Sequence, residues 1–403
     1  MELFWLEHKK LWRKKIVKIC VLLCFVYCVI FGSILSFQWF CFGSSDDYTS
    51  AFGNNFDGYT VIKDSQEYAL SFGGELTDET LQKIVSDYQQ MEADGMGEEL
   101  EKTDWQIVNS WLGTLYPELR DTSNYKTMIS YVDPDKLTGF YERRQQVLDE
   151  FLEISGQVGA EKEFLHQMER KVEKPFHYEW VEGWSTLLGS MVADLGVVMA
   201  LFLGIVLSSL FAGEWHDNTS TLVLTTRNGW GKIALAKILT GLAFTVELFA
   251  LLAVSNVISQ LFFMGTAGWD MPIQNIKLIA VAPMNMLQAE IYEYAFVLLG
   301  AIGFAGIVMF ISAAVKNNVL TLLLSLAVVY GPMMIAEYLP YKMQKALDLI
   351  PLVGSSTDIF RTNTFRILGK LIWSPYLLIT IPVLIGILCM PFAIKSWSRR
   401  MKA

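Results

Sequence analysis

Two carboxylates stand inside long apolar stretches of the chain, where an ionisable side chain could bind a cation or a polar substrate. Asp194 precedes one charge-free run, Glu247 interrupts another, and we place each about ten residues inside its span. A charge near the centre of a bilayer costs roughly 3 kcal/mol or more, so each carboxyl must face water, find a partner or be protonated. We expect either a translocation path lined by one or both, or protonated carboxyls hydrogen-bonded between helices.

Other ionisable groups are weaker candidates. Glu290 and Glu293 stand where a fourth span is expected to begin, and we predict solvated helix ends there rather than ligands. Cys20, Cys24 and Cys28 share one face of a helix, a spacing that would suit a metal or a lipid. We favour their interpretation as small apolar residues of a packed helix.

The sequence contains no motif that would predict catalysis. It lacks His-Glu-x-x-His, Gly-x-Ser-x-Gly and Cys-x-x-Cys. The nearest approach to a phosphate-binding loop, Gly231-Lys232, lacks the earlier glycine and is followed by Ile233. We therefore predict that the chain is not an enzyme, carries no cofactor or metal, and does not bind nucleic acid.

The elements that must position these residues are membrane helices. With 53% hydrophobic and 18% charged residues, the chain is more apolar than a soluble protein, which carries roughly 25% charged residues. A transmembrane helix needs about 20 apolar residues. The gaps between charges accordingly predict an α-helical membrane protein with spans at 16–42, 184–213, 238–266, 294–315, 317–336 and 371–394. The first run is too long for a signal peptide, and no Ala-x-Ala-like site follows it before Asp46.

The distribution of basic residues along the chain predicts the orientation of these spans. Residues 1–15, which we predict to form an interfacial amphipathic helix, are rich in lysine, and so are the loop 214–237 and the tail 395–403. Basic residues collect on the cytoplasmic side, so both termini are expected there. The segment 337–370 is a partial exception, because we place it outside although it contains Lys342, Lys345, Arg361, Arg366 and Lys370. We interpret it as amphipathic or partly re-entrant.

The segment 43–183 is expected to form an extracellular, mainly helical domain. It holds 29 acidic against 12 basic residues and no cysteine, which suits a bacterial exterior better than a disulfide-rich ectodomain. Helices are predicted over 76–91 and 135–174. For the core we predict Trp105, Trp111, Tyr116 and Tyr125, with Phe140, Val147, Leu148, Phe151, Leu152, Ile154, Phe164 and Leu165. The acidity could attract cations, but a merely soluble surface is the simpler interpretation.

The loop between the second and third spans carries a recognisable pattern. A glutamate leaves the second span, a Thr-Leu-x-Leu-Thr run follows, and an arginine and a lysine lead into the third span; these residues are Glu214, Thr221, Leu222, Leu224, Thr225, Arg227 and Lys237. A short amphipathic loop of this kind can offer its leucines and Trp230 to a groove on a partner protein. The loop resembles the first cytoplasmic loop of ABC-2-type transporter permeases. The large insert after the first span resembles the branch with bacitracin, lantibiotic and sodium exporter permeases.

This resemblance implies a fold, partners and a function. In that family the matching segment is a coupling helix that docks on a separate ATPase subunit, which binds ATP and Mg. We expect two copies of that ATPase and a second permease, the same or related, in a bacterial cytoplasmic membrane. The expected function is export of a peptide antibiotic or amphiphile, with a role in antibiotic resistance. Export of sodium or another cation is the alternative, and a ligand-binding receptor or sensor is the rival of a different class.

Overall fold

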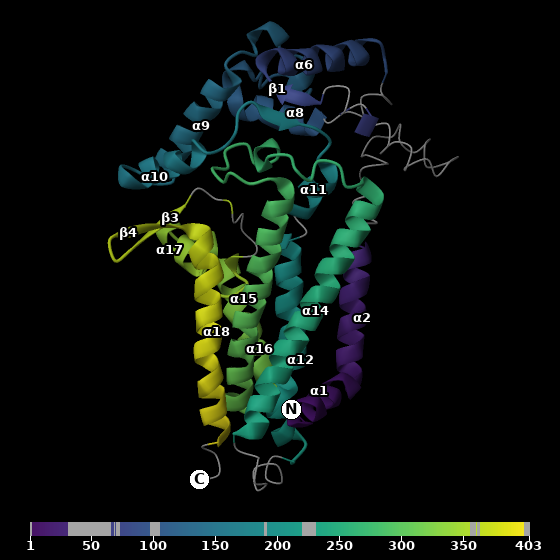
Figure 1. Ribbon diagram of the computed structural model, residues 1–403, viewed down its shortest axis with the longest axis vertical. Helices are drawn as coiled ribbons and strands as arrows, with labels where there is room; N and C mark the ends of the chain where they lie inside the picture. Colours follow the sequence, from purple (N-terminus) through teal and green to yellow (C-terminus); the bar gives the residue numbers. More distant parts are fainter. Residues whose placement is uncertain are drawn as a thin grey trace, which may run out of the picture.

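The chain forms a bundle of long apolar helices with a smaller helical domain at one end (Figure 1). The computed structural model describes residues 2–30, 66–67, 69, 73–96, 105–188, 192–219, 231–354, 360 and 363–398. Within these residues, five helices are long and apolar enough to cross a membrane. They are α12 (Val192–His216), α14 (Lys232–Met264), α15 (Met286–Val315), α16 (Asn318–Ala336) and α18 (Ser374–Ser398). This confirms an α-helical protein and indicates a multi-pass membrane protein.

Two N-terminal helices lie beside this bundle. They are α1 (Glu2–Arg13) and α2 (Lys15–Val29), and both pack on α14. Leu11 of α1 is buried against the bundle while Lys9 and Arg13 are exposed, the two-faced pattern of an amphipathic helix. The predicted span 16–42 is described only as far as residue 30, so a sixth span stays a prediction.

The helices begin and end at different residues from those the charge-free runs predicted. A short helix, α11 (Glu182–Thr186), precedes α12, and residues 189–191 between them lie outside the described residues, so the predicted single helix over 184–213 stays a prediction. The helix α15 starts eight residues earlier than expected, because Asn285 and Gln288 form a reciprocal capping box. Residues 371–373 belong to a strand, so the last helix starts only at Ser374. The capping box and the strand, rather than the positions of charged residues, therefore determine where α15 and α18 begin.

The helices α15 and α18 approach each other closely through glycines. A Cβ atom on Gly306 would lie 2.5 Å from the carbonyl oxygen of Gly386, and one on Gly386 would lie 2.6 Å from the Cα of Gly303. No larger residue fits there without separating the helices. Close contact of this kind is a principal source of helix association in membranes, where burial of apolar surface gives no advantage over lipid.

A second contact joins α12 to α15. The hydroxyl of Ser312 donates a hydrogen bond to the carbonyl of Ser208 at 2.7 Å and accepts bonds from the amides of Phe211 and Ala212, each at 3.1 Å. One side chain therefore joins the last turns of two apolar helices. The helix α15 is consequently held on one side by α12 and on the other by α18.

The helical domain occupies residues 73–96 and 105–178. Its elements are β1 (Gly74–Leu76), α6 (Asp78–Ala93), α8 (Trp105–Leu115), α9 (Phe140–Ile154), α10 (Ala160–Glu169) and β2 (Phe176–Tyr178), with short 3₁₀ helices η3 (Pro117–Leu119), η4 (Met128–Ser130) and η5 (Pro134–Lys136). The strands β1 and β2 pair antiparallel. Trp111, Tyr116 and Phe140 are fully buried in its core.

Three predictions for this domain were wrong. The helix expected over 135–174 is two helices, because Gly156 and Gly159 adopt left-handed backbone angles between α9 and α10. Tyr125 is fully exposed rather than in the core, since it lies in a polar turn between Asp121 and Lys126. Ile154, the last residue of α9, is also exposed. Apolar residue type alone could not identify these surface positions.

Three segments that are far apart in the sequence meet at one end of the bundle, which we call the domain end (Figure 1). Trp111 of the helical domain donates a hydrogen bond to the carbonyl of Asn275 at 3.0 Å, in the segment between α14 and α15 that contains η7 (Ile273–Asn275). Thr364 of the segment between α16 and α18 donates one to Gln157 at 2.7 Å. The segments predicted to share one side of the membrane are therefore neighbours, and α1 lies at the opposite, loop end.

The segment between α16 and α18 contains α17 (Tyr341–Leu347) and an antiparallel hairpin of β3 (Thr364–Ile367) and β4 (Lys370–Trp373). Between them the chain reaches in toward α15. Leu352 and Pro351 approach the positions where Gly300 and Gly303 would carry a Cβ, at 3.2 and 3.3 Å. The segment is thus irregular and lies partly between helices.

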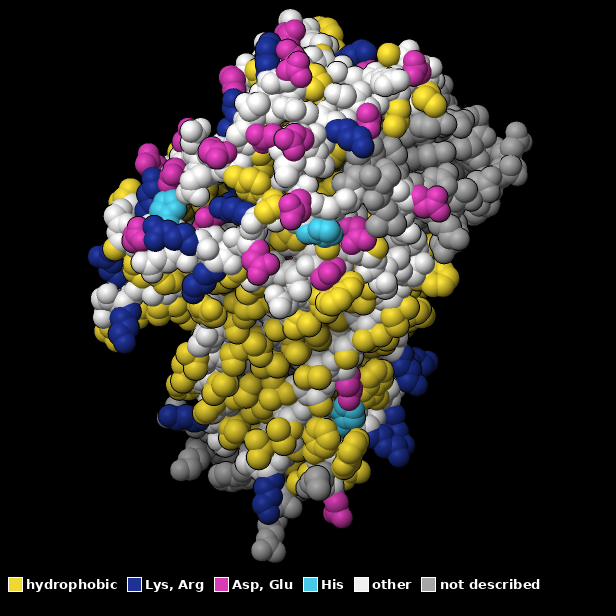
Figure 2. Space-filling view, turned by 45° about the horizontal axis from the view of Figure 1, so that its top comes forward, with side chains coloured by type: hydrophobic (Ala, Val, Ile, Leu, Met, Phe, Trp, Pro, Cys, Tyr) yellow, Lys and Arg dark blue, Asp and Glu magenta, His cyan; other side chains and the backbone are white. Residues whose placement is uncertain are grey.

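The surface of the molecule matches a membrane protein (Figure 2). A broad band of hydrophobic side chains covers the bundle, and acidic and basic side chains gather beyond it, over the helical domain and at the opposite end. Exposed apolar residues of the bundle helices include Val254, Ile258, Phe262, Leu323 and Leu388. Such a continuous apolar surface is suited to lipid or to another membrane protein.

We expect the replacement Gly306→Ala to destabilise the bundle by about 1–3 kcal/mol, because the added methyl group must push α15 away from α18. Gly331→Ala in α16 is the matched control, since a Cβ there meets no atom within 4 Å. Thermal unfolding of the detergent-solubilised chain should give a lower Tm for the first variant only. Equal midpoints would contradict the close approach of α15 and α18.

Candidate functional site

Three helices meet at a cluster of charges at the loop end of the bundle. The carboxylate of Glu214, in the last turn of α12, accepts hydrogen bonds from Lys10 of α1 at 2.5 Å and from Lys237 of α14 at 2.9 Å. Lys237 also donates to Glu7 of α1 at 2.8 Å. We call these four residues the loop-end charge cluster. It brings Glu214 and Lys237, the two ends of the predicted coupling loop, into direct contact.

The cluster is shielded from water. Glu214 is 4% exposed and Lys237 is 2% exposed, so neither charge is hydrated and each depends on the other. Partial burial lowers the pKa of Lys10, but the hydrogen bond and charge of Glu214 outweigh this and raise the pKa above its ordinary value. Burial, followed by the positive charges of Lys237 and Lys10, lowers the pKa of the neighbouring Lys14. The buried carboxylate of Glu214 thus stabilises the charged form of Lys10, whereas Lys14 lies beside like charges.

Local structure explains how the cluster forms. Asn218 has a left-handed backbone (φ 55°), which ends α12, and the hydroxyl of Thr219 donates to Glu214. Sequence analysis identified Glu214 and Lys237 but missed Glu7 and Lys10. Their spacing of three residues, which places both on one face of α1, was the available signal. The other predicted coupling residues, Thr221, Leu222, Leu224, Thr225 and Arg227, lie outside the described residues.

The two intramembrane carboxylates contact different N-terminal helices. Glu247 of α14 is bonded by Trp12 at 3.0 Å and lies 3.1 Å from a ring nitrogen of His8, both on α1. Asp194 lies in the first turn of α12 and accepts a hydrogen bond from Tyr27 of α2. Both side chains are exposed on the bundle surface rather than enclosed by it. The structure thus gives each a protein partner, and a shared path between them stays a prediction.

The prediction that Glu290 and Glu293 are solvated helix ends was wrong. Their side chains are 3% and 4% exposed, because α15 starts at Met286 and carries them on its buried face. The hydroxyl of Tyr294, one helical turn further on, is the polar neighbour of the Glu290 carboxylate. Spacing at i, i+3 and i+7 with the apolar Val297 could have indicated this buried face. Within the described chain, no group of three His, Cys, Asp or Glu side chains could hold a metal ion.

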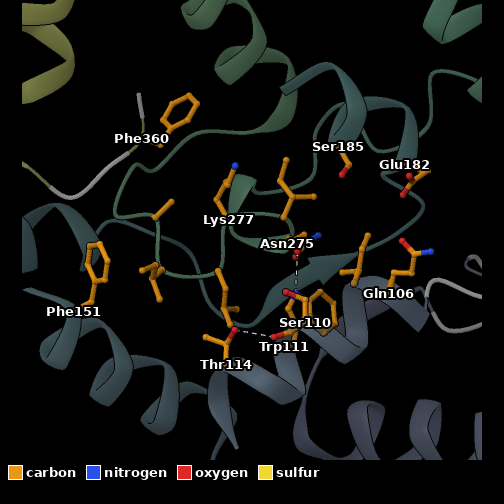
Figure 3. A pocket seen from close by; sticks show the side chains of 15 residues that line it. Gln106, Ser110, Trp111, Thr114, Phe151, Glu182, Ser185, Asn275, Lys277 and Phe360 are labelled. Carbon is orange, nitrogen blue, oxygen red and sulfur yellow. Dashed lines mark hydrogen bonds between the residues drawn. The ribbon is translucent and has the colours of Figure 1, made fainter. Parts of the chain in front are cut away.

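A cavity of about 440 Å³ lies between the helical domain and the segment that joins α14 to α15 (Figure 3). This size falls within the roughly 300–1,000 Å³ of small-molecule sites. Polar side chains from α8 and α11 surround one part, and Phe151 and Phe360 lie at the other. Asn275 is almost fully buried there, and its side-chain oxygen accepts no hydrogen bond from the described residues. The cavity could therefore bind an amphipathic ligand that supplies a donor.

The helical domain is attached beside this cavity by a buried arginine. Arg144 of α9 donates to the carbonyls of Leu278 and Ala280 at 2.7 and 3.1 Å, and to the carboxylate of Glu169. Lys174 also contacts Glu169 at 2.7 Å. Burial would raise the pKa of Glu169, but the hydrogen bonds and charges of Lys174 and Arg144 outweigh it and lower the pKa.

Comparison of the chain with protein-family models, with curated proteins and with solved structures gave no match. The class of protein to which this chain belongs is therefore defined by its structure alone. It is a multi-pass, α-helical membrane protein with a buried charge cluster at one end of its bundle and a domain with a cavity at the other.

We expect Glu214→Gln to lower stability by roughly 3 kcal/mol, because it removes the negative partner of a nearly buried lysine. Glu118→Gln is the control: it breaks an ion pair to Arg143 of 2.5 Å, shorter than the 2.9 Å between Glu214 and Lys237, but with a half-exposed carboxylate, and should cost less than about 1 kcal/mol. Thermal unfolding in detergent measures both. Similar losses in the two variants would contradict the account of a buried cluster.

Acid should destabilise the helical domain, because it protonates Glu169. Because the pKa of this group is lowered in the folded protein, its contribution is present above the ordinary value of 4.5 and is lost as pH falls through the folded value. Between pH 7 and acid, the unfolding temperature should drop more steeply for the wild type than for Glu169→Gln. Glu163→Gln, an exposed change on the same helix, should keep the wild-type slope; three parallel slopes would exclude this role for Glu169.

Proposed function

We propose that this chain is the permease subunit of an ATP-binding-cassette exporter in a bacterial cytoplasmic membrane. In this proposal the chain has six spans, both termini are cytoplasmic, and the segment 43–183 is extracellular. The single observation that carries the proposal is the loop-end charge cluster. It joins Glu214 and Lys237, at the two ends of the loop expected to contact an ATPase, by a buried ion pair.

A loop can transmit force to the spans only if the helix ends that flank it are held rigidly together. Glu214 lies in the last turn of α12 and Lys237 in the second turn of α14, and their contact connects the two helices across the loop. Glu7 and Lys10 add α1 to the same connection. A displacement of the loop 214–237 would thus move three helices together instead of bending the loop.

The energy for such movement would come from outside this chain. The sequence has no phosphate-binding loop, so ATP and Mg would bind to a partner ATPase, in two copies, beside a second permease that is the same or related. The substrate class that we favour is a peptide antibiotic or an amphiphile, with sodium or another cation as the alternative. Asp194 and Glu247 remain candidates for the path, next to α2 and α1 respectively.

One observation favours a second candidate function. The cavity at the domain end is formed by the helical domain on one side and by the segment between α14 and α15 on the other. A ligand bound there would contact both and would alter how firmly they are held together. This arrangement would suit a receptor or sensor that reports an external ligand to a cytoplasmic partner.

Purification of the solubilised chain from its native membrane distinguishes the two functions. We expect an ATPase to be recovered with the wild type and to be lost with the double replacement Leu222→Ala, Leu224→Ala, because these leucines are the predicted contacts. Lys232→Gln changes an exposed residue of the same segment 214–237, at the start of α14, and should retain the ATPase. Recovery of a kinase in place of an ATPase would favour the sensor, and an ATPase that stays with the leucine variant would contradict the proposed coupling site.

A further inference from the structure

The hairpin of β3 and β4 lies where a membrane surface is expected. It joins α16 to α18, two helices apolar and long enough to cross a membrane. Figure 1 shows it extending sideways from the bundle, past the first turns of α18 and beneath α10. Because β4 ends at Trp373 and α18 begins at Ser374, the hairpin leads directly into an apolar helix and is expected at the level of the lipid headgroups.

The tip of this hairpin is made by an unusual residue. Ile367 pairs with Lys370 in the ladder, so Leu368 and Gly369 form the two-residue turn, with φ of 49° and 80°. Turns with two left-handed residues strongly favour Asn-Gly, because asparagine and glycine tolerate this backbone. A leucine is strained there. It is also 99% exposed, so no packing within the described chain offsets the strain.

The basic residues around the hairpin fall into two groups. Arg366 pairs with Glu161 of the helical domain at 2.8 Å, and Lys345 of α17 donates to the carbonyl of Thr364 and lies 4.4 Å from the ring centre of Phe365. These two hold the hairpin in place. Lys342 and Lys370 are exposed and form no ion pair with any described residue.

We propose that the β3–β4 hairpin and α17 form an anchor for an anionic phospholipid surface. Leu368 inserts among the headgroups, and Lys342 and Lys370 bind lipid phosphates. Tyr338 and Met343, in the same segment between α16 and α18, are also exposed, as apolar and aromatic residues at membrane interfaces are. Transfer of Leu368 out of water offsets its strained backbone. Lys342 and Lys370, two of the basic residues that departed from the expected charge rule, thereby have a function.

The anchor also positions the helical domain. Thr364 of β3 is bonded to Gln157 and Arg366 to Glu161, so the hairpin is joined to the turn between α9 and α10 and to the first turn of α10. A hairpin held by lipid therefore fixes the height of the domain above the bilayer. This role goes beyond the proposed export function and holds equally for a sensor.

The first test measures insertion of the tip. The full chain is reconstituted into nanodiscs of phosphatidylcholine mixed with phosphatidylglycerol, with or without bromine on the upper acyl chains. The fluorescence added by Leu368→Trp should be quenched by brominated lipid, whereas that added by Tyr125→Trp, a fully exposed position of the helical domain, should not. Equal quenching at both positions, or none at residue 368, would overturn the proposal.

The second test measures the requirement for anionic lipid. In the Leu368→Trp chain, quenching should be greater with phosphatidylglycerol than with phosphatidylcholine alone, and the double change Lys342→Gln, Lys370→Gln should abolish this difference. Lys136→Gln, at an exposed lysine of η5, is the matched control and should retain it. A difference that survives loss of both lysines would refute their role as phosphate ligands.

A third variant separates lipid binding from folding of the hairpin. Leu368→Asn supplies the residue that this turn prefers, so the hairpin itself should become more stable in detergent. In anionic nanodiscs, amide hydrogen exchange of residues 364–373 should nevertheless become faster than in the wild type, because the apolar contact is lost. Slower exchange in both media would show that residue 368 serves only the turn, and would contradict the anchor.

Discussion

A buried carboxylate that needs positive partners organises the loop end of this protein. Glu214 is removed from water by the helices around it, and an unpaired charge in such a place would be strongly destabilising. Lys237 and Lys10 supply the partners, and they can do so only if α14 and α1 lie against the end of α12. The position of the N-terminal helix is therefore determined by electrostatics as much as by the burial of Leu11.

At the domain end, the buried charge that needs partners is positive instead of negative. Arg144 is completely buried, and its guanidinium is satisfied by two backbone carbonyls and by Glu169. The carbonyls belong to the segment between α14 and α15, so the arginine can be satisfied only when the helical domain is docked on the bundle. One buried charge at each end thus joins elements that apolar packing would leave free to slide.

The apolar helices could be predicted from the sequence, because their long charge-free runs leave few alternatives. Their boundaries could not, since these depend on caps such as Asn285 with Gln288 and on the strand that takes up residues 371–373. For the candidate site, Glu214 and Lys237 were found through the loop pattern. The partners on α1 were missed because they lie more than two hundred residues away in the sequence, and only the packing of α1 on α14 brings them near.

Burial of Glu290 shows the limit of arguments from charge. A glutamate near the expected end of a span was interpreted as a solvated terminus, but α15 starts eight residues earlier than expected and carries it on the inner face of the helix. That helix is also the central one. Ser312 of α15 forms hydrogen bonds with the end of α12, the helix that carries Glu214. At its other end, α15 follows directly after the segment to which Arg144 donates hydrogen bonds. The two buried charges at opposite ends are thus connected through one rigid helix. A movement that starts at the loop end and leaves these bonds intact can therefore reach the helical domain through α15, and also through α14, which carries Lys237 and leads into the same segment.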